Sequence, residues 1–191
     1  MRAARMATLA YYYFDFRDVK KQTRYGLLSS LLSQLSAQLD SSHDILAKFS
    51  SDNADRTQKP TSSALMECIK DMLSLPGQGQ IYIVIDALDE CPNVLGTPSA
   101  REEVLCLIKD LVDLKLPNVH ICVASRPEID ILAVFEPLTS LQISVHDEKG
   151  QKEDIIKYIK SVVQSDRRMQ KWKKADQELA INMLSEKADG M

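Results

Sequence analysis

The stretch that decides the fold is Ile81–Glu90, which reads IYIVIDALDE. Its first half, Ile81–Ile85, is apolar and rich in β-branched residues, and it follows the helix-breaking sequence Pro76–Gly79 closely. A continuous apolar run of this kind predicts a central parallel strand that is covered on both faces. Asp86 ends the run, which places a carboxylate at the carboxyl edge of the sheet, where α/β folds bind their ligands.

Two further carboxylates follow within one turn and complete a D-x-x-D-E pattern, Asp86-x-x-Asp89-Glu90. Mg²⁺ prefers oxygen ligands and keeps part of its water shell, so Asp86 is a candidate to hold Mg²⁺ through water. Asp89 and Glu90 are candidates to orient or deprotonate a water molecule aimed at a γ-phosphate. The alternative is a strand that merely ends at a polar turn, with Asp89 or Glu90 capping the next segment.

A second signal follows the next buried strand, Val119–Ala124, where Arg126 precedes Pro127. The proline disfavours helical geometry at Arg126, so the arginine side chain is expected to project from the sheet edge. A guanidinium at this place is a candidate ligand for a γ-phosphate and for its developing charge. An ion pair of Arg126 with Glu128 or Asp130, or with the neighbouring acids, explains the sequence equally well.

The rest of the chain alternates between strand and helix patterns. Two further strands are predicted, Leu9–Phe16 and Leu141–Val145, and 41–59 is predicted as a loop with a helical turn at 45–49. Helices are predicted over 24–40, 61–73, 101–116, 155–163 and 176–188. The alternation predicts a parallel α/β sheet with helices on both faces over 1–150. The last two helices have no strand between them, so 151–191 is predicted to begin a helical subdomain.

Composition narrows the function further. With 24 basic and 27 acidic residues the net charge is -3, which argues against a nucleic-acid partner. The four cysteines lie far apart without a C-x-x-C pair, which favours reduced thiols and disfavours a zinc site. No apolar run approaches the roughly 18 residues of a membrane span. We therefore predict a cytoplasmic protein that binds neither nucleic acid nor membrane.

Three motifs in combination resemble a known family. The runs LAYYYFDFRD (9–18), IYIVIDALDEC (81–91) and NVHICVASRPE (118–128) resemble the NACHT domains of fungal signalling NTPases and the related nephrocystin-like N-terminal domain. A leucine-rich helix between the first two runs adds to the likeness. The resemblance extends from about Leu9 to Met191, including the closing segment Ser185–Met191.

This resemblance implies a three-layer P-loop NTPase fold of the STAND class, whose members switch and oligomerise on sensing a ligand. Asp86 then matches the Walker B acid that holds Mg²⁺ through water. Asp89 and Glu90 match the catalytic acids, and Arg126 matches a sensor arginine that contacts the nucleotide. The implied cofactors are Mg²⁺ with ATP or GTP, and the implied partners are proteins or further copies of the same module.

The sequence departs from this family in one respect: the 191 residues contain no G-x-x-x-x-G-K-[ST] loop. The resemblance places that loop and the first strand just before Met1, and Met1–Thr8 resembles the end of the helix that follows it. Gly77-Gln78-Gly79 precedes a strand and cannot present its amides at a helix N-terminus. We therefore expect a truncated product that binds Mg·ATP or Mg·GTP weakly or not at all and does not hydrolyse them.

The missing strand would leave sheet edges unpaired, which a partner segment or the Leu141–Val145 strand could close. Two other functions remain open at this point. One is a catalytically inactive interaction module that pairs with intact relatives. The other is an unrelated flavodoxin-like binding domain, which leaves the D-x-x-D-E pattern and Arg126 as coincidence.

Overall fold

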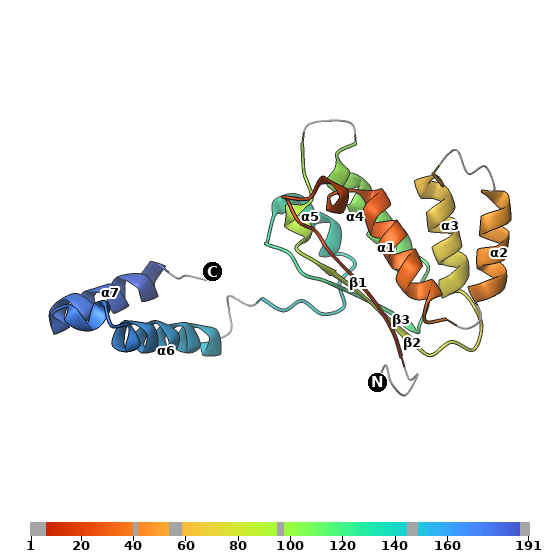
Figure 1. Cartoon of the computed structure of the whole chain (residues 1–191). Helices are drawn as coiled ribbons and strands as arrows, with labels where there is room; N and C mark the ends of the chain where they lie inside the picture. Colours follow the sequence, from red (N-terminus) through yellow and green to blue (C-terminus); the bar gives the residue numbers. More distant parts are fainter. Residues whose placement is uncertain (1–6, 40–41, 54–58, 95–97, 145–148, 188–191) are drawn as a thin grey trace. The chain divides into compact units, whose positions relative to one another are not determined.

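The computed structural model describes residues 7–39, 42–53, 59–94, 98–144 and 149–187 (Figure 1). The chain divides into two compact units, Met1–Leu138 and Thr139–Met191. The first unit contains the sheet and the candidate site. The second unit is helical.

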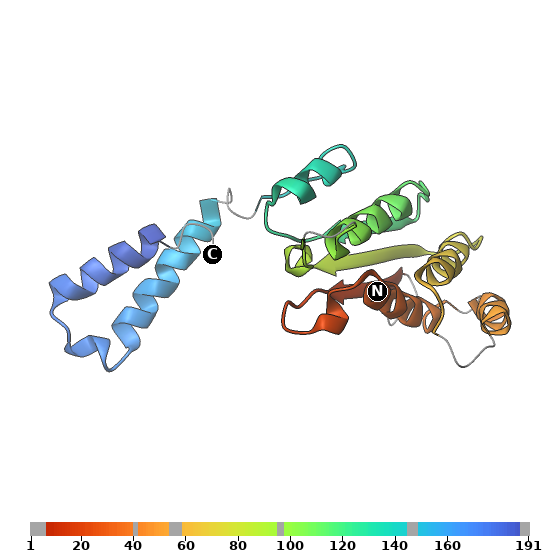
Figure 2. The same cartoon turned by 90° about the horizontal axis from the view of Figure 1, so that it is seen from above.

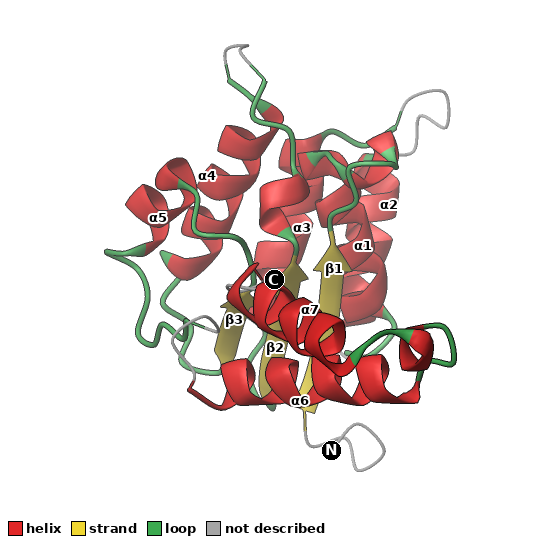
Figure 3. Ribbon diagram, turned by 90° about the vertical axis from the view of Figure 1, so that its left-hand side faces the viewer, coloured by secondary structure: helices red, strands yellow, loops and turns green. Residues whose placement is uncertain are grey.

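The sheet of the first unit has three strands, β1 (Ala7–Tyr13), β2 (Gln80–Asp86) and β3 (Val119–Val123), in the order β1-β2-β3. Both neighbouring pairs are parallel, and the three arrowheads point the same way in Figure 3. Tyr13 lies opposite Asp86, and Ile85 lies opposite Val123. The segments that follow the three strands therefore meet at one edge, and the central position predicted for β2 is confirmed.

Three helices of the first unit begin at side-chain caps that the sequence provides. The Thr23 and Thr61 hydroxyls accept hydrogen bonds from the N–H groups of Gly26 and Ala64 at the starts of α1 and α3. Ser99 and Glu102 form a reciprocal capping box at the start of α4. The helices are α1 (Arg24–Ser36), α2 (His43–Asp52), α3 (Ser62–Leu73), α4 (Ala100–Val112) and α5 (Ile129–Phe135), with 3₁₀ turns η2 (Val19–Lys21) and η4 (Leu88–Glu90).

Two of these helices differ from the prediction. α2 occupies most of the segment predicted as a loop, because Ile45, Leu46 and Phe49 pack one apolar side against the core. α5 was not predicted, since its seven residues are too few to show a helical period, yet Ile131 is buried. None of the described helices combines the length and apolar character that crossing a bilayer requires.

The core lies between one face of the sheet and the helices α1, α3 and α4. Residues on the inner face alternate along the strands and are fully or almost fully buried: Ala10, Tyr12, Phe14, Ile81, Ile83 and Ile85. On the other face Leu9, Tyr11, Tyr13 and Tyr82 keep between 37% and 52% of their surface exposed. The third layer predicted from the apolar run of β2 is thus not found among the described residues of the first unit. Tyrosine tolerates this exposure because its ring is amphipathic.

The second unit consists of α6 (Lys149–Ser165), the 3₁₀ turn η6 (Met169–Lys171) and α7 (Lys174–Lys187). α6 and α7 lie side by side (Figure 2). Val163, on α6, is buried. The two helices predicted for this region are confirmed.

The strand predicted at Leu141–Val145 is wrong over Leu141–Ser144, and Val145 lies outside the described residues. Leu141–Ser144 has no regular structure and is exposed. Alternating apolar residues form a strand only where a neighbour pairs with the backbone, and the described sheet contains only β1, β2 and β3. Closure of the sheet by this segment is therefore not found.

Candidate functional site

Asp86 ends β2 at the carboxyl edge of the sheet, with its side chain exposed. Its Oδ1 accepts a hydrogen bond from the N–H of Ala87 at 2.8 Å, and within the described residues its other oxygen accepts none. Ala87 has the left-handed backbone conformation, φ 53° and ψ 44°, which is uncommon for a residue with a Cβ. This sharp turn sends the chain directly from the strand into η4.

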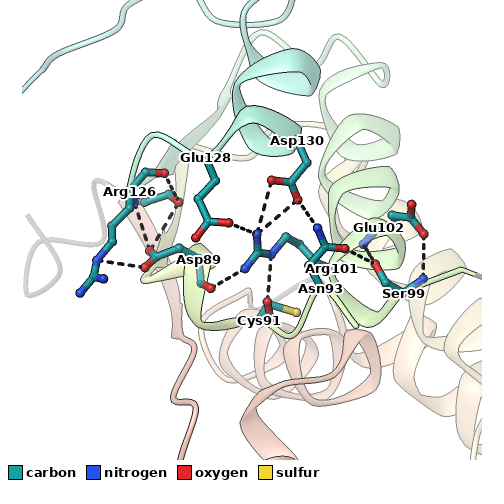
Figure 4. Close-up of polar contacts among 10 residues, drawn as sticks. Asp89, Cys91, Asn93, Ser99, Arg101, Glu102, Arg126, Glu128 and Asp130 are labelled. Atoms are coloured by element: carbon teal, nitrogen blue, oxygen red, sulfur yellow. Dashed lines mark hydrogen bonds and ion pairs between the residues drawn. The ribbon is translucent and has the colours of Figure 1, made fainter. Parts of the chain in front are cut away.

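Asp89 lies in η4 and faces the segment after β3 (Figure 4). Its side chain is only 12% exposed. Oδ1 accepts hydrogen bonds from the backbone N–H of Arg126 at 3.1 Å and from the Ser125 hydroxyl at 3.5 Å. Oδ2 lies 3.4 Å from the Arg126 Nε. Both oxygens of this carboxylate are therefore engaged with the loop after β3.

Arg126 follows β3 and its side chain is 84% exposed. Among the described acids its guanidinium pairs only with Asp89. The alternative pairing with Glu128 or Asp130 is not found, since both of those carboxylates contact Arg101 instead. The pairing with a neighbouring acid of the D-x-x-D-E pattern is the one that the structure contains.

The Glu90 side chain contacts the turn after β1, whereas Asp89 contacts the segment after β3. Its Oε2 accepts a hydrogen bond from the backbone N–H of Phe16 at 3.0 Å. Asp15 in the same turn is an acid that the sequence reasoning missed. Arg17 hydrogen-bonds to it through Nε at 2.9 Å and lowers the pKa of Asp15 to about 2. No signal in the sequence marked Asp15, because it lies inside the strand predicted over Leu9–Phe16, whereas β1 ends at Tyr13.

Arg101 was predicted only as part of a helix, but it lies at the centre of this edge (Figure 4). Its side chain is 6% exposed. Nε donates to the Cys91 carbonyl at 2.9 Å, and Nη2 donates to the Asp89 carbonyl at 2.6 Å. Nη1 donates to the Glu128 carboxylate and lies 3.3 Å from Asp130 Oδ2. Burial lowers the pKa of Arg101, but the hydrogen bonds to Glu128 and Asp130 have the larger combined effect, so the pKa is raised above its ordinary value.

The described residues contain no group of three or more His, Cys, Asp or Glu side chains placed to hold a metal ion. A protein cage for a metal is therefore not found in this part of the chain. Mg²⁺ does not need such a cage, because it is commonly held by one or two carboxylates, water and the phosphates of a substrate. The exposed Asp86 carboxylate, one oxygen of which accepts no hydrogen bond from the residues that the structure describes, fits that kind of ligand.

Residues 2–126 match the family model described as Nephrocystin 3, N-terminal. The chain belongs to this family. The nephrocystin 3 N-terminal match covers more than half of the chain, includes Asp86, Asp89 and Glu90, and ends at Arg126. The resemblance to a nephrocystin-like N-terminal domain is thereby confirmed. No curated protein and no solved structure matches the chain.

Proposed function

We propose that this chain is part of a NACHT-type signalling NTPase of the STAND class, in which a bound nucleotide controls assembly. The observation that carries the proposal is that Asp86, Asp89 and Glu90 lie at or just after the end of β2 and Arg126 lies just after β3, at the same carboxyl edge of a parallel sheet, with Asp89 paired to Arg126. This edge is where open α/β sheets bind ligands. Three carboxylates and one exposed guanidinium suit an Mg²⁺-bound triphosphate better than an uncharged ligand.

The hydrogen bonds distinguish the three acids. Asp86 is exposed, and no hydrogen bond from the described part of the chain reaches its Oδ2, so it is the proposed ligand of Mg²⁺ through water. Both oxygens of Asp89 contact the Arg126 loop. Among the described residues, only Oε2 of Glu90 accepts a hydrogen bond, from the Phe16 N–H, which leaves Oε1 to accept a proton or orient a water molecule. Glu90 is therefore the better candidate for water activation, and Asp89 the better candidate for holding Arg126.

Arg126 is proposed as the residue that senses the γ-phosphate. Exposed ion pairs contribute about 0–1 kcal/mol, so the 3.4 Å pair with Asp89 holds the guanidinium weakly. A phosphate group offers more negative charge and bidentate geometry and can compete for the same guanidinium. The arginine can then change partner without a large cost to the fold.

The 191 residues lack a G-x-x-x-x-G-K-[ST] sequence, whose amides and lysine cradle the phosphates in P-loop NTPases. Without them the acids would repel the nucleotide, so this chain by itself is proposed to bind Mg·ATP or Mg·GTP weakly and not to hydrolyse it. Hydrolysis belongs to members that contain the loop. A cytoplasmic location is proposed as well, because all four cysteines are free thiols.

One observation favours a second candidate, a catalytically inactive module that pairs with intact relatives. The sheet face with Leu9, Tyr11, Tyr13 and Tyr82 is partly exposed in the first unit. Aromatic residues are enriched in protein interfaces, so this face suits a protein partner better than open solvent. In this reading the acids and Arg126 keep a structural role only.

Paramagnetic broadening by Mn²⁺ separates the two candidates, since Mn²⁺ binds oxygen ligands as Mg²⁺ does. Mn·ATP added to the ¹⁵N-labelled chain is expected to broaden the amide signals of Ala87 and Arg126 first. Asp86→Asn should remove this selectivity. Asp110→Asn, which changes an exposed acid on α4, is the matched control and should not.

Broadening centred away from Ala87, or unchanged in Asp86→Asn, would contradict the proposed nucleotide edge. Calorimetry with Mg·ATP and Mg·GTP tests the other half of the proposal. No binding is expected at micromolar concentrations, and tight binding would show that other residues replace the phosphate loop. Substituting the residues equivalent to Asp89 and Glu90 in an intact family member and comparing turnover tests their proposed ranking.

A further inference from the structure

Arg101 occupies a position that its own helix does not favour. It is the second residue of α4, and a cation in the first turn of a helix opposes the helix dipole. Its guanidinium is also nearly buried, which is costly unless every donor finds an acceptor. The contacts that offset both costs must therefore come from outside α4.

Those contacts come from two loops that are far apart in the sequence (Figure 4). The carbonyl groups of Asp89 and Cys91 belong to the segment after β2. The carboxylates of Glu128 and Asp130 belong to the segment after β3 and the start of α5. The planar guanidinium thus bridges the two segments. Nε binds the Cys91 carbonyl, Nη2 binds the Asp89 carbonyl, and Nη1 contacts the two carboxylates.

The bridged segments carry Asp89 and Arg126, the ion pair in which Arg126 is the proposed sensor of the γ-phosphate. Arg101 contacts the backbone of Asp89 directly, at its carbonyl. It reaches Arg126 in two steps, because the Glu128 N–H donates to the Arg126 carbonyl at 2.9 Å. Moving the Arg101 guanidinium would therefore shift both partners of the contact between the Asp89 carboxylate and Arg126.

We propose that Arg101 is a positioning residue that sets the distance between Asp89 and Arg126 without itself touching the nucleotide. The role of the positioned pair rests on the function proposed above, whereas the bridge does not depend on any nucleotide. Lysine cannot replace Arg101, because its compact ammonium cannot present donors to two carbonyls and two carboxylates in one plane.

The test measures the ¹H–¹⁵N signals of the Arg126 backbone N–H and Nε–H in the full chain. Asp89→Asn defines the signal positions when the carboxylate is lost. Arg101→Met keeps an apolar stem without charge, and Arg101→Lys keeps the charge without the planar donors. Leu105→Ala, a buried residue on the same helix, controls for loss of stability alone.

Both Arg101 variants are expected to move the Arg126 signals away from the wild-type positions and toward those of Asp89→Asn, whereas Leu105→Ala should leave them in place. If Arg101→Met does not fold, Arg101→Lys alone decides. Unmoved signals in a folded Arg101 variant, or an equal movement in Leu105→Ala, would overturn the proposal. No nucleotide is present, so failure of the Mn·ATP experiment and failure of this one are independent results.

Discussion

Replacing Asp89 and Arg126 separately shows which of their contacts holds the two loops together. Asp89→Ala removes the charged acceptor of the Arg126 backbone N–H at 3.1 Å, whereas Arg126→Ala keeps that N–H and removes only the guanidinium. Comparing the two variants therefore separates the stability contributed by the backbone hydrogen bond from that contributed by the exposed ion pair. Asp89→Asn is an intermediate case, since an amide oxygen still accepts the N–H.

The expected magnitudes differ clearly. A hydrogen bond to a charged group contributes about 1.5–3 kcal/mol, and the Ser125 contact at 3.5 Å adds little. Asp89→Ala should therefore lower the free energy of unfolding by about 2–3 kcal/mol. The Arg126 side chain is 84% exposed, so Arg126→Ala should cost less than about 1 kcal/mol. The coupling energy in a double-mutant cycle should be below about 1 kcal/mol.

Urea unfolding measures these values, provided that the signal reports on the first unit. The single tryptophan, Trp172, lies in the second unit, whereas every tyrosine except Tyr158 lies in the first. Near-ultraviolet circular dichroism of the tyrosines is therefore the suitable signal. If Arg126→Ala proves as costly as Asp89→Ala, or if the coupling exceeds about 1.5 kcal/mol, the guanidinium is a structural group and is not free to change partner.

Three further substitutions test the packing that supports this edge. Tyr12→Phe should stabilise the chain by about 1–2 kcal/mol, because the Tyr12 hydroxyl is buried and has no hydrogen-bond partner among the described residues. Burial raises the pKa of Tyr12 from 10.0 to about 12, so the folded state holds its proton more tightly and wild-type stability should fall as pH rises through this interval. Urea midpoints across that interval should show a smaller fall in Tyr12→Phe, and parallel curves would contradict the burial argument. Ser99→Ala removes the capping box of α4 and should lower the free energy of unfolding by about 1 kcal/mol, while an unchanged urea midpoint would show that Glu102 suffices. Gly26→Ala would place a Cβ 2.3 Å from the Lys20 carbonyl and should cost about 2 kcal/mol or more, and a thermal scan with no loss would mean that η2 shifts freely.

The sequence by itself determined three of the four predicted strands and the acid that ends the central one. The inner-face residues Ile81, Ile83 and Ile85 and the acid that ends their strand lie within one short segment, and local periodicity is enough to read them. Parallel strands of such βαβ units place their carboxyl ends together, so the sequence predicts Asp86 and Arg126 at one edge of the sheet. The caps at Thr61 and Ser99 are equally local.

Only the tertiary structure decided which charged groups pair. Arg126 lies 37 residues from Asp89 and contacts it, although Glu128 and Asp130 are nearer in the sequence. Those two acids are engaged by Arg101, whose place on a helix gave no sign of its burial. Apolar periodicity shows that a face of a strand avoids water, but not what covers it, which is why the exposed tyrosines of the sheet were unforeseen. Periodicity is a property of neighbours in sequence. The partner of a charged side chain and the layer that packs on a sheet face depend on segments that only folding brings together.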